Sequence, residues 1–276
     1  MTQNLSVLIT GCSTGIGLNA AITLSQLGYQ VFATARKQTD VDNLIALGLN
    51  AHLLDLADEA SIDAAFSWVL KQTGGSLYAL FNNGAYGQAG AIEDLPSQAL
   101  KEQFQINVFG WHYLTRLVIP VMRKQGFGRI IQNSSVLGLV AMPYRGAYNA
   151  SKFAIEGYTD TLRLELTGSG IQVSLIEPGP IETQFRANAL AKTVEFIDVK
   201  NSVHKDNYKI QIDRLSKEGP SNKFTLPASA VTKKVIHALS SKKAKTRYYV
   251  TQPTYIMAFF KRVLPFTWLD KILIKG

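Results

Sequence analysis

Short apolar runs alternate with segments of helical periodicity along most of the chain. The apolar runs predict strands at residues 6–10, 29–35, 51–54, 77–81, 129–133, 172–177 and 247–250. The helical pattern covers residues 15–28, 40–47, 60–71, 100–125, 147–167 and 228–239. Strands that alternate with helices form a parallel sheet with helices on both faces. We therefore predict an α/β fold with a doubly wound, Rossmann-like sheet of about seven strands.

Length and composition fit one large domain. The chain has 276 residues, of which 46% are hydrophobic and 18% charged, enough to bury a core. Cys12 is the single cysteine, so no internal disulfide can form. The first residues lack a signal-peptide pattern, and no apolar run reaches the ~18 residues of a spanning helix. We expect a cytoplasmic protein and exclude collagen, secreted mini-proteins and integral membrane proteins.

The expected domain has three parts. Residues 1–183 form a dinucleotide-binding and catalytic core. The polar segment 184–226 interrupts the β–α rhythm, as lids over binding sites do. Residues 227–276 form a C-terminal helix, a strand and an apolar, basic tail.

Positive charge is concentrated near the C-terminus. Residues 192–276 hold 17 Lys and Arg against 6 Asp and Glu, whereas residues 1–191 hold 12 against 14. Such an excess fits either an anionic partner or a solvated basic face of an ordinary enzyme. We favour the solvated face and expect no nucleic-acid partner, because the lysines are scattered and not interleaved with aromatic residues.

The first predicted strand leads into a glycine loop with glycines at 11, 15 and 17. In a dinucleotide site, Gly11 permits the tight turn, Gly15 lets the backbone approach a pyrophosphate, and Gly17 lets helix and strand pack closely. The helix N-terminus that follows would stabilise the anion. The spacing G-x-x-x-G-x-G differs from the common fingerprint, and a glycine-rich turn without a ligand is the alternative.

The end of the second strand points to the cofactor. NAD sites usually place an acid there for the ribose 2′-OH, but this chain has Arg36. A guanidinium pairs well with a 2′-phosphate, so we predict NADP(H), with NAD(H) the less favoured choice. A surface arginine with no ligand is the alternative. Asp55, after the third strand, is placed to meet the adenine ring.

Tyr148 and Lys152 lie four residues apart at the start of a predicted helix, so they share one face. A nearby ammonium and a helix N-terminus both favour phenolate, which would fit Tyr148 for general acid/base work. Ser135 follows the fifth strand, where side chains of open α/β sheets meet ligands. Taken alone, a Tyr-x-x-x-Lys pair is usually an ordinary surface feature.

Together these segments resemble the short-chain dehydrogenase/reductase family, main single-domain branch, nearest to steroid- and retinol-type dehydrogenases and bacterial aldehyde reductases. The matching pieces, in family order, are residues 10–17, Asn82-Asn83-Gly84-Ala85, Asn107, Asn133-Ser134-Ser135, Tyr148-x-x-x-Lys152 and residues 178–183. One departure is that the family usually has Asn-Asn-Ala-Gly where this chain has Gly84-Ala85. We expect the loop to tolerate this exchange of small residues.

The resemblance implies a role for each matching residue. Tyr148 would exchange a proton with the substrate oxygen, and Lys152 would bind the nicotinamide ribose and lower the pKa of Tyr148. Ser135, favoured over Ser134 by its 13-residue offset from Tyr148, would stabilise the reacting oxygen. Asn107 would hold a water in a proton relay. The implied cofactor-binding residues are Gly11, Ser13, Thr14, Gly15, Ile16, Gly17, Arg36, Asp55, Leu56, Asn83, Gly84, Tyr148, Lys152, Pro178, Gly179, Ile181 and Thr183.

The expected substrate walls are Tyr86, Met142, Tyr144 and Phe185, with Leu139 and the lid. Their apolar content suggests a lipophilic carbonyl compound or alcohol. The two long helices imply a homodimer or homotetramer. The tail from Tyr255 to Ile274 could lie in a membrane interface, but we favour its packing over the pocket or a partner subunit.

Two functions follow from these features. We favour an NADP(H)-dependent oxidoreductase that interconverts a lipophilic carbonyl and its alcohol. The alternative is a regulator that senses the NADPH/NADP ratio without turnover. The four histidines lack metal-ligand spacing, so we expect no metal.

Overall fold

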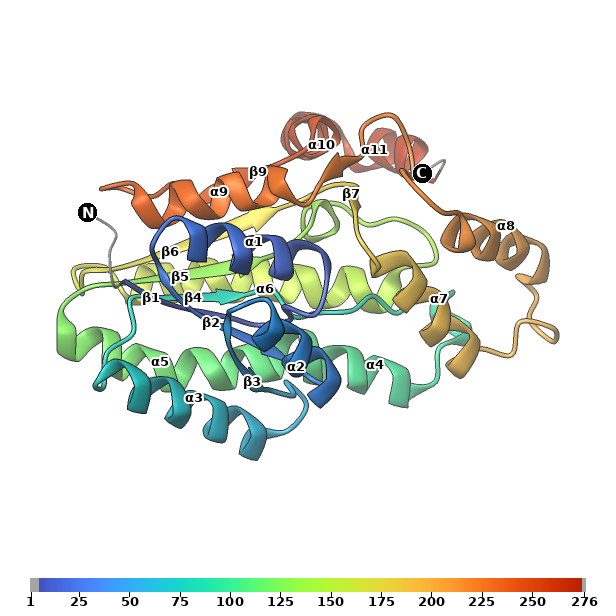
Figure 1. Ribbon diagram of the computed structural model, residues 1–276. Coiled ribbons are helices and arrows are strands. Elements are labelled where there is room, and N and C mark those ends of the chain that lie inside the picture. Colours follow the sequence, from blue (N-terminus) through green and yellow to red (C-terminus); the bar gives the residue numbers. More distant parts are fainter. Residues whose placement is uncertain (1–4, 275–276) are drawn as a thin grey trace.

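The computed structural model describes residues 5–274. Seven parallel strands form the main sheet, in the order β3-β2-β1-β4-β5-β6-β9 (Figure 1). Their bounds are β1 (Ser6–Ile9), β2 (Gln30–Ala35), β3 (Asn50–Leu53), β4 (Ala79–Asn82), β5 (Gly128–Asn133), β6 (Ile171–Glu177) and β9 (Arg247–Tyr249). The predicted doubly wound α/β fold is confirmed. The chain order reverses between β1 and β4, and open α/β sheets bind ligands at such switch points.

Helices cover both faces of this sheet, because its strands are apolar on both sides. In β1, Val7 and Ile9 join one buried cluster and Leu8 joins the other, as the two-residue period of a strand requires. One face packs against α1 (Gly15–Gln26), α2 (Gln38–Ala46) and α9 (Ser229–Ser240). The other packs against α3 (Glu59–Thr73), α5 (Gly110–Gln125) and α6 (Gly146–Glu165).

The helix predicted over 100–125 is interrupted in the structure. It begins earlier, as α4 (Ser97–Phe104), passes through a π-helical turn (Gln105–Phe109) and continues as α5. A π turn inserts an extra residue into the helix and often marks a functional site. Here it contains Asn107.

The lid segment is more ordered than its polar sequence suggested. It contains α7 (Phe185–Phe196) and α8 (Lys205–Ser216), and β7 (Ile181–Glu182) pairs with β8 (Leu226–Pro227) at its two ends. Its sequence signal is weak because its apolar residues are scattered among polar and charged ones. Buried Tyr208 holds the lid in place: its hydroxyl donates to Asp94 (2.8 Å) and accepts from the Ala91 N–H (2.9 Å).

The C-terminal tail forms two further helices, α10 (Gln252–Val263) and α11 (Phe266–Leu273), which lie together beside α9 (Figure 1). Their inner faces pack Met257, Leu269 and Leu273 against the loop after β5. Phe266 and Trp268 remain exposed on the outside. No helix between residues 5 and 274 is long and apolar enough to cross a membrane.

Candidate active site

The glycine loop shapes one end of a cavity of about 560 Å³ at the carboxyl edge of the sheet. Gly11 and Gly15 have φ of +69° and +60°, which favours glycine. A Cβ at Gly11 would lie 2.5 Å from the Gly84 Cα. Thr14, the residue before α1, provides no side-chain cap, and the first turn of α1 contains no acid. The N–H groups of this turn can therefore receive an anion.

Buried polar groups hold the loop after β4 against the glycine loop. The Thr10 hydroxyl accepts from the backbone N–H groups of Asn83 and Gly84, both at 2.9 Å. The Asn83 amide donates to the Thr10 carbonyl (3.0 Å), and the indole of buried Trp111 donates to the Gly84 carbonyl (2.8 Å). These bonds anchor the Gly84-Ala85 segment, in which the order of the two small residues is unusual for the family.

Tyr148, Lys152 and Ser135 all line the same cavity. Lys152 is 2% exposed, and its Nζ donates to the Asn133 carbonyl (2.7 Å). The same Nζ lies 4.5 Å from the centre of the Trp111 ring and 5.6 Å from that of Tyr148. The Ser135 hydroxyl lies close enough to Tyr148 to lower the pKa of the phenol. The structure thus brings a phenol, an amine and a hydroxyl together beside the glycine loop.

Burial dominates the electrostatics of the Tyr148 and Lys152 pair. It raises the pKa of Tyr148 to about 12, against the smaller opposing effect of the neighbouring Ser135 hydroxyl. It lowers the pKa of Lys152 to about 7, and the nearby Glu156 carboxylate opposes this shift. In the protein without cofactor the pKa of Tyr148 is therefore raised, not lowered, because burial disfavours the phenolate. That Lys152 lowers this pKa stays a prediction. The phenol is held in its protonated, donating form.

The two serines after β5 face different surroundings. The Ser134 hydroxyl is buried without a hydrogen-bond partner in the described chain, and a Cβ on Gly138 would lie 2.7 Å from it. It therefore lies against the one-turn 3₁₀ helix Val136–Gly138. The Ser135 hydroxyl instead meets Tyr148 and accepts from the Leu137 N–H (3.1 Å). This geometry favours Ser135 over Ser134 as the partner of the phenol.

Asn107 is fully buried, and protein groups engage its side-chain amide. It accepts from the Tyr86 N–H (3.2 Å) and donates to the Tyr86 carbonyl (2.9 Å) and the Ser151 hydroxyl (3.3 Å). The amide thus fixes the loop after β4 to the start of α6. Its part in a proton relay stays a prediction.

Most of the predicted cofactor-binding residues line the cavity. They are Gly11, Ser13, Thr14, Gly15, Ile16, Asn83, Gly84, Tyr148, Lys152, Pro178, Gly179, Ile181 and Thr183. Gly17, Arg36, Asp55 and Leu56 lie outside it.

The four residues outside the cavity differ in burial and in their contacts. Gly17 serves packing, since a Cβ there would lie 2.1 Å from the Gly11 carbonyl oxygen. Leu56 is buried, and the Asp55 carboxylate accepts from the Ala57 N–H (2.9 Å). Arg36 is exposed at the end of β2. No acid of the described chain forms an ion pair with it.

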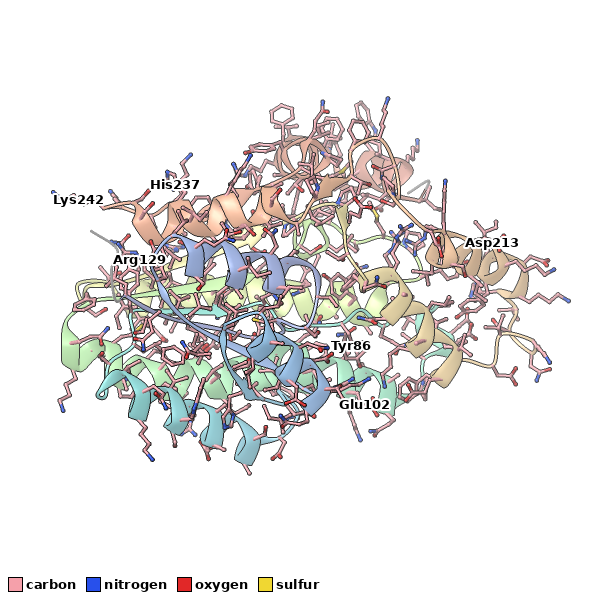
Figure 2. The ribbon with its side chains drawn as sticks, in the orientation of Figure 1. Tyr86, Glu102, Arg129, Asp213, His237 and Lys242 are labelled. Carbon is pink, nitrogen blue, oxygen red and sulfur yellow. The ribbon has the colours of Figure 1, made fainter. Side chains whose placement is uncertain are left out.

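Two of the four predicted substrate residues, Met142 and Phe185, line the cavity, but Tyr86 and Tyr144 do not. Tyr86 lies on the side that carries Glu102 of α4 (Figure 2), with Lys192 5.8 Å from its ring centre. The expectation for Tyr86 and Tyr144 is therefore corrected, and Leu139 also lies outside the cavity.

Tyr144 serves the lid instead. Its hydroxyl is hydrogen-bonded to His204 (3.2 Å), and its ring packs edge-on against Tyr208. Its backbone has a φ of 60°, rare for a residue with a side chain. These contacts fix the segment between α7 and α8 to the loop before α6, so the Tyr144 side chain packs against the lid.

Several residues that shape the site carry no local sequence signal. Trp111 is one of them: its ring centre lies 4.5 Å from the Lys152 Nζ, and this contact joins segments that are far apart in the chain. Arg145, Arg186 and Arg214 line the cavity from three different elements. Their spacing along the chain does not predict that they meet. No group of His, Cys, Asp or Glu within residues 5–274 is arranged to hold a metal ion.

A family model for short chain dehydrogenases matches residues 6–193. The chain belongs to this family. The uncharacterized oxidoreductase YbbO of Escherichia coli (strain K12) is 42% identical to this dehydrogenase, over 97% of this chain and 93% of the relative. An NADPH-dependent 3-dehydrocapnine reductase of Ornithobacterium rhinotracheale is 30% identical over 97% and 95%.

Solved structures agree with this assignment. A short-chain dehydrogenase/reductase from Burkholderia phymatum, in complex with NAD, aligns with a TM-score of 0.78 at 25% identity, covering 95% of this dehydrogenase and 93% of that chain. The dehydrogenase is therefore an oxidoreductase of a nucleotide-binding family that acts on CH–OH or C=O groups.

Proposed function

We propose that this dehydrogenase interconverts a lipophilic carbonyl compound and its alcohol with NADP(H), using Tyr148 as the general acid and base. One observation carries the proposal: the Tyr148 phenol, the adjacent Ser135 hydroxyl and the nearby Lys152 amine converge in the cavity that the glycine loop closes. A proton donor, an oxygen-binding hydroxyl and a cation are what carbonyl reduction needs from a protein.

The residues present fit a dinucleotide. The uncapped first turn of α1 would bind the pyrophosphate, and Gly15 leaves room for it, since a Cβ there would already meet Thr183 at 2.9 Å. Residues 178–183 would hold the nicotinamide end. When bound, NADPH supplies the hydride.

The chain's own groups handle the proton. The Tyr148 hydroxyl would donate its proton to the carbonyl oxygen as negative charge develops there. The Ser135 hydroxyl would donate a hydrogen bond to the same oxygen. Lys152 would bind the nicotinamide ribose and stabilise the phenolate left on Tyr148. In alcohol oxidation the same proton moves the other way.

The preference for NADP(H) rests on Arg36. Its side chain is exposed beside the expected adenosine site, and no carboxylate in residues 5–274 neutralises it. A guanidinium in this position matches the geometry of a phosphate. NADPH dependence of the 3-dehydrocapnine reductase is consistent with this choice.

The lipophilic substrate rests on the walls near Tyr148. Val136, Leu137, Met142 and Met257 line this part of the cavity, together with Phe185, whose ring centre lies 5.2 Å from that of Tyr148. Burial of an apolar substrate body against them would stabilise the complex by roughly 25 cal/mol per Å².

The test is a screen of aliphatic and aromatic aldehydes and ketones with NADPH, in which turnover is measured as the loss of NADPH absorbance. We expect turnover of at least one apolar carbonyl compound. Tight NADPH binding without turnover of any compound would contradict an enzymatic role and favour the sensing regulator.

Assembly stays a prediction. Members of this family commonly oligomerise, and the exposed Phe109 and Phe153 lie next to or on the long helices α5 and α6. We propose a homodimer or homotetramer through this face, and sedimentation equilibrium measures it directly.

A further inference from the structure

Three arginines meet at the cavity from separate elements. Arg145 is the residue before α6, Arg186 lies in the first turn of α7, and Arg214 lies in the last turn of α8. All three line the cavity that contains Tyr148, and all three are partly buried. They lie 28 or more residues apart in sequence, so only the fold brings them together.

The hydrogen bonds of these arginines go to neutral groups. Arg145 donates to the Met142 sulfur (2.7 Å), and Arg214 donates to the Gln211 side-chain oxygen (3.1 Å). Arg186 donates to the backbone carbonyls of Arg214 and Gly219. In the part of the chain that the structure describes, no carboxylate forms an ion pair with any of the three.

The guanidinium groups also repel one another. Burial, and then the charge of Arg214, lowers the pKa of Arg145 to about 10. Burial and Arg186 lower the pKa of Arg214 in the same way. The other titratable Lys, Asp or Glu side chains that line the cavity are Lys152 and Glu182, so three guanidinium groups and an amine share the cavity with one carboxylate, which is itself exposed.

Unpaired cations in a partly buried site carry a desolvation cost that a bound anion would offset. A guanidinium binds carboxylate, phosphate or sulfonate oxygens with a matching fork of N–H donors. Arg145 lies three residues before Tyr148, hence within about one helical turn of the proton donor. An anion held by the three arginines would therefore lie in the same cavity as the proton donor.

We propose that Arg145, Arg186 and Arg214 form an anion subsite that binds an acid group of the substrate. The substrate class is then a carbonyl compound with an apolar body and a carboxylate, phosphate or sulfonate. This proposal rests on the proposed function, because it assigns the substrate of the same site. The phosphates of the cofactor are the other anionic groups that these arginines would bind. The KM for NADPH, measured below, distinguishes the two ligands.

A matched substrate pair tests the subsite. We compare kcat/KM for 10-oxodecanoate and for its methyl ester, in which one methyl group removes the charge at the far end. Wild type should prefer the acid. Arg145→Gln and Arg214→Gln should each reduce the acid-to-ester ratio about tenfold or more, since each removes a charged hydrogen-bonding partner. Arg123→Gln, an exposed change on α5 outside the cavity, is the control and should keep the ratio.

The KM for NADPH, measured in the same variants, separates the two anion sources. A higher KM for NADPH with an unchanged acid-to-ester ratio would assign the arginines to the cofactor and overturn the proposal. Equal rates for acid and ester in wild type would also overturn it.

A binding measurement separates failure of the subsite from failure of the proposed function. Decanoate should raise the melting temperature of the NADP-loaded protein more than decan-1-ol does, and the two arginine variants should lose this difference. That result would support the subsite even if no carbonyl compound is turned over. Equal shifts for decanoate and decan-1-ol would contradict it.

Discussion

The two walls of the cavity are built in different ways. On the nucleotide side, glycines and buried polar groups satisfy one another, as Thr10, Asn83 and Trp111 do. On the substrate side, Arg145, Arg186 and Arg214 face the cavity without acidic partners. The first wall is preorganised for a ligand whose shape is fixed. The second retains unpaired charge, which can select among ligands that differ in charge.

Lys152 lies on the nucleotide side of the cavity, and removing its amine should have the largest effect on activity. Lys152→Met keeps an unbranched chain in the buried space but removes the ammonium. We expect kcat/KM for carbonyl reduction to fall by roughly 10² or more, because general acid–base groups contribute about 10²–10⁴.

Lys124→Met, an exposed lysine on α5, controls for the loss of a charge far from the site. Wild-type activity of Lys152→Met would remove the amine from the mechanism. The buried Lys152 amine would then have no function on the nucleotide side of the cavity, and the comparison of the two sides would fail.

Cofactor choice should respond next. Arg36→Asp should raise the KM for NADPH about 10- to 100-fold and change that for NADH little, because it replaces an attraction to the 2′-phosphate by repulsion. Lys233→Asp, an exposed charge reversal on α9, is the matched control. Equal losses with both cofactors would show that Arg36 does not read the phosphate.

The smallest effects should come from Trp111→Phe and Tyr208→Phe, which should lower the stability of the protein similarly but weaken the binding of different ligands. Trp111→Phe leaves the Gly84 carbonyl without its indole donor and should lower the free energy of unfolding by about 1–3 kcal/mol, measured by urea denaturation. We also expect a weaker affinity for NADPH.

Tyr208→Phe removes the hydrogen bonds to Ala91 and Asp94 under the lid. It should lower the free energy of unfolding by a similar amount but weaken only substrate binding. If both variants bound NADPH and substrate equally weakly, the assignment of the two sides of the cavity to different ligands would be wrong.

The nucleotide wall could be predicted from sequence because its signals are local. Glycines at 11 and 15 are required by positive φ angles, and the Tyr148/Lys152 pair by one turn of helix. The β–α rhythm likewise predicted all seven strands of the sheet, since each is a short segment that contains apolar residues.

The substrate wall could not be predicted in this way. Tyr144 and Tyr86 were expected in the cavity from their places in loops, but their orientation depends on contacts with His204 and Lys192, far along the chain. The arginine cluster depends on how α7 and α8 fold back over the sheet, which a polar sequence does not reveal. The burial that raises the pKa of Tyr148 was also not predicted, because it depends on the whole fold.

The central claim is that the Tyr148 hydroxyl transfers the proton. The direct measurement is the single-turnover rate of NADPH oxidation in wild type and in Tyr148→Phe, with NADPH affinity measured by its fluorescence in both. We predict a loss in rate of about 10²–10⁴ and an affinity close to that of wild type, since the change removes one oxygen. A variant that reduces the carbonyl at the wild-type rate would contradict the account.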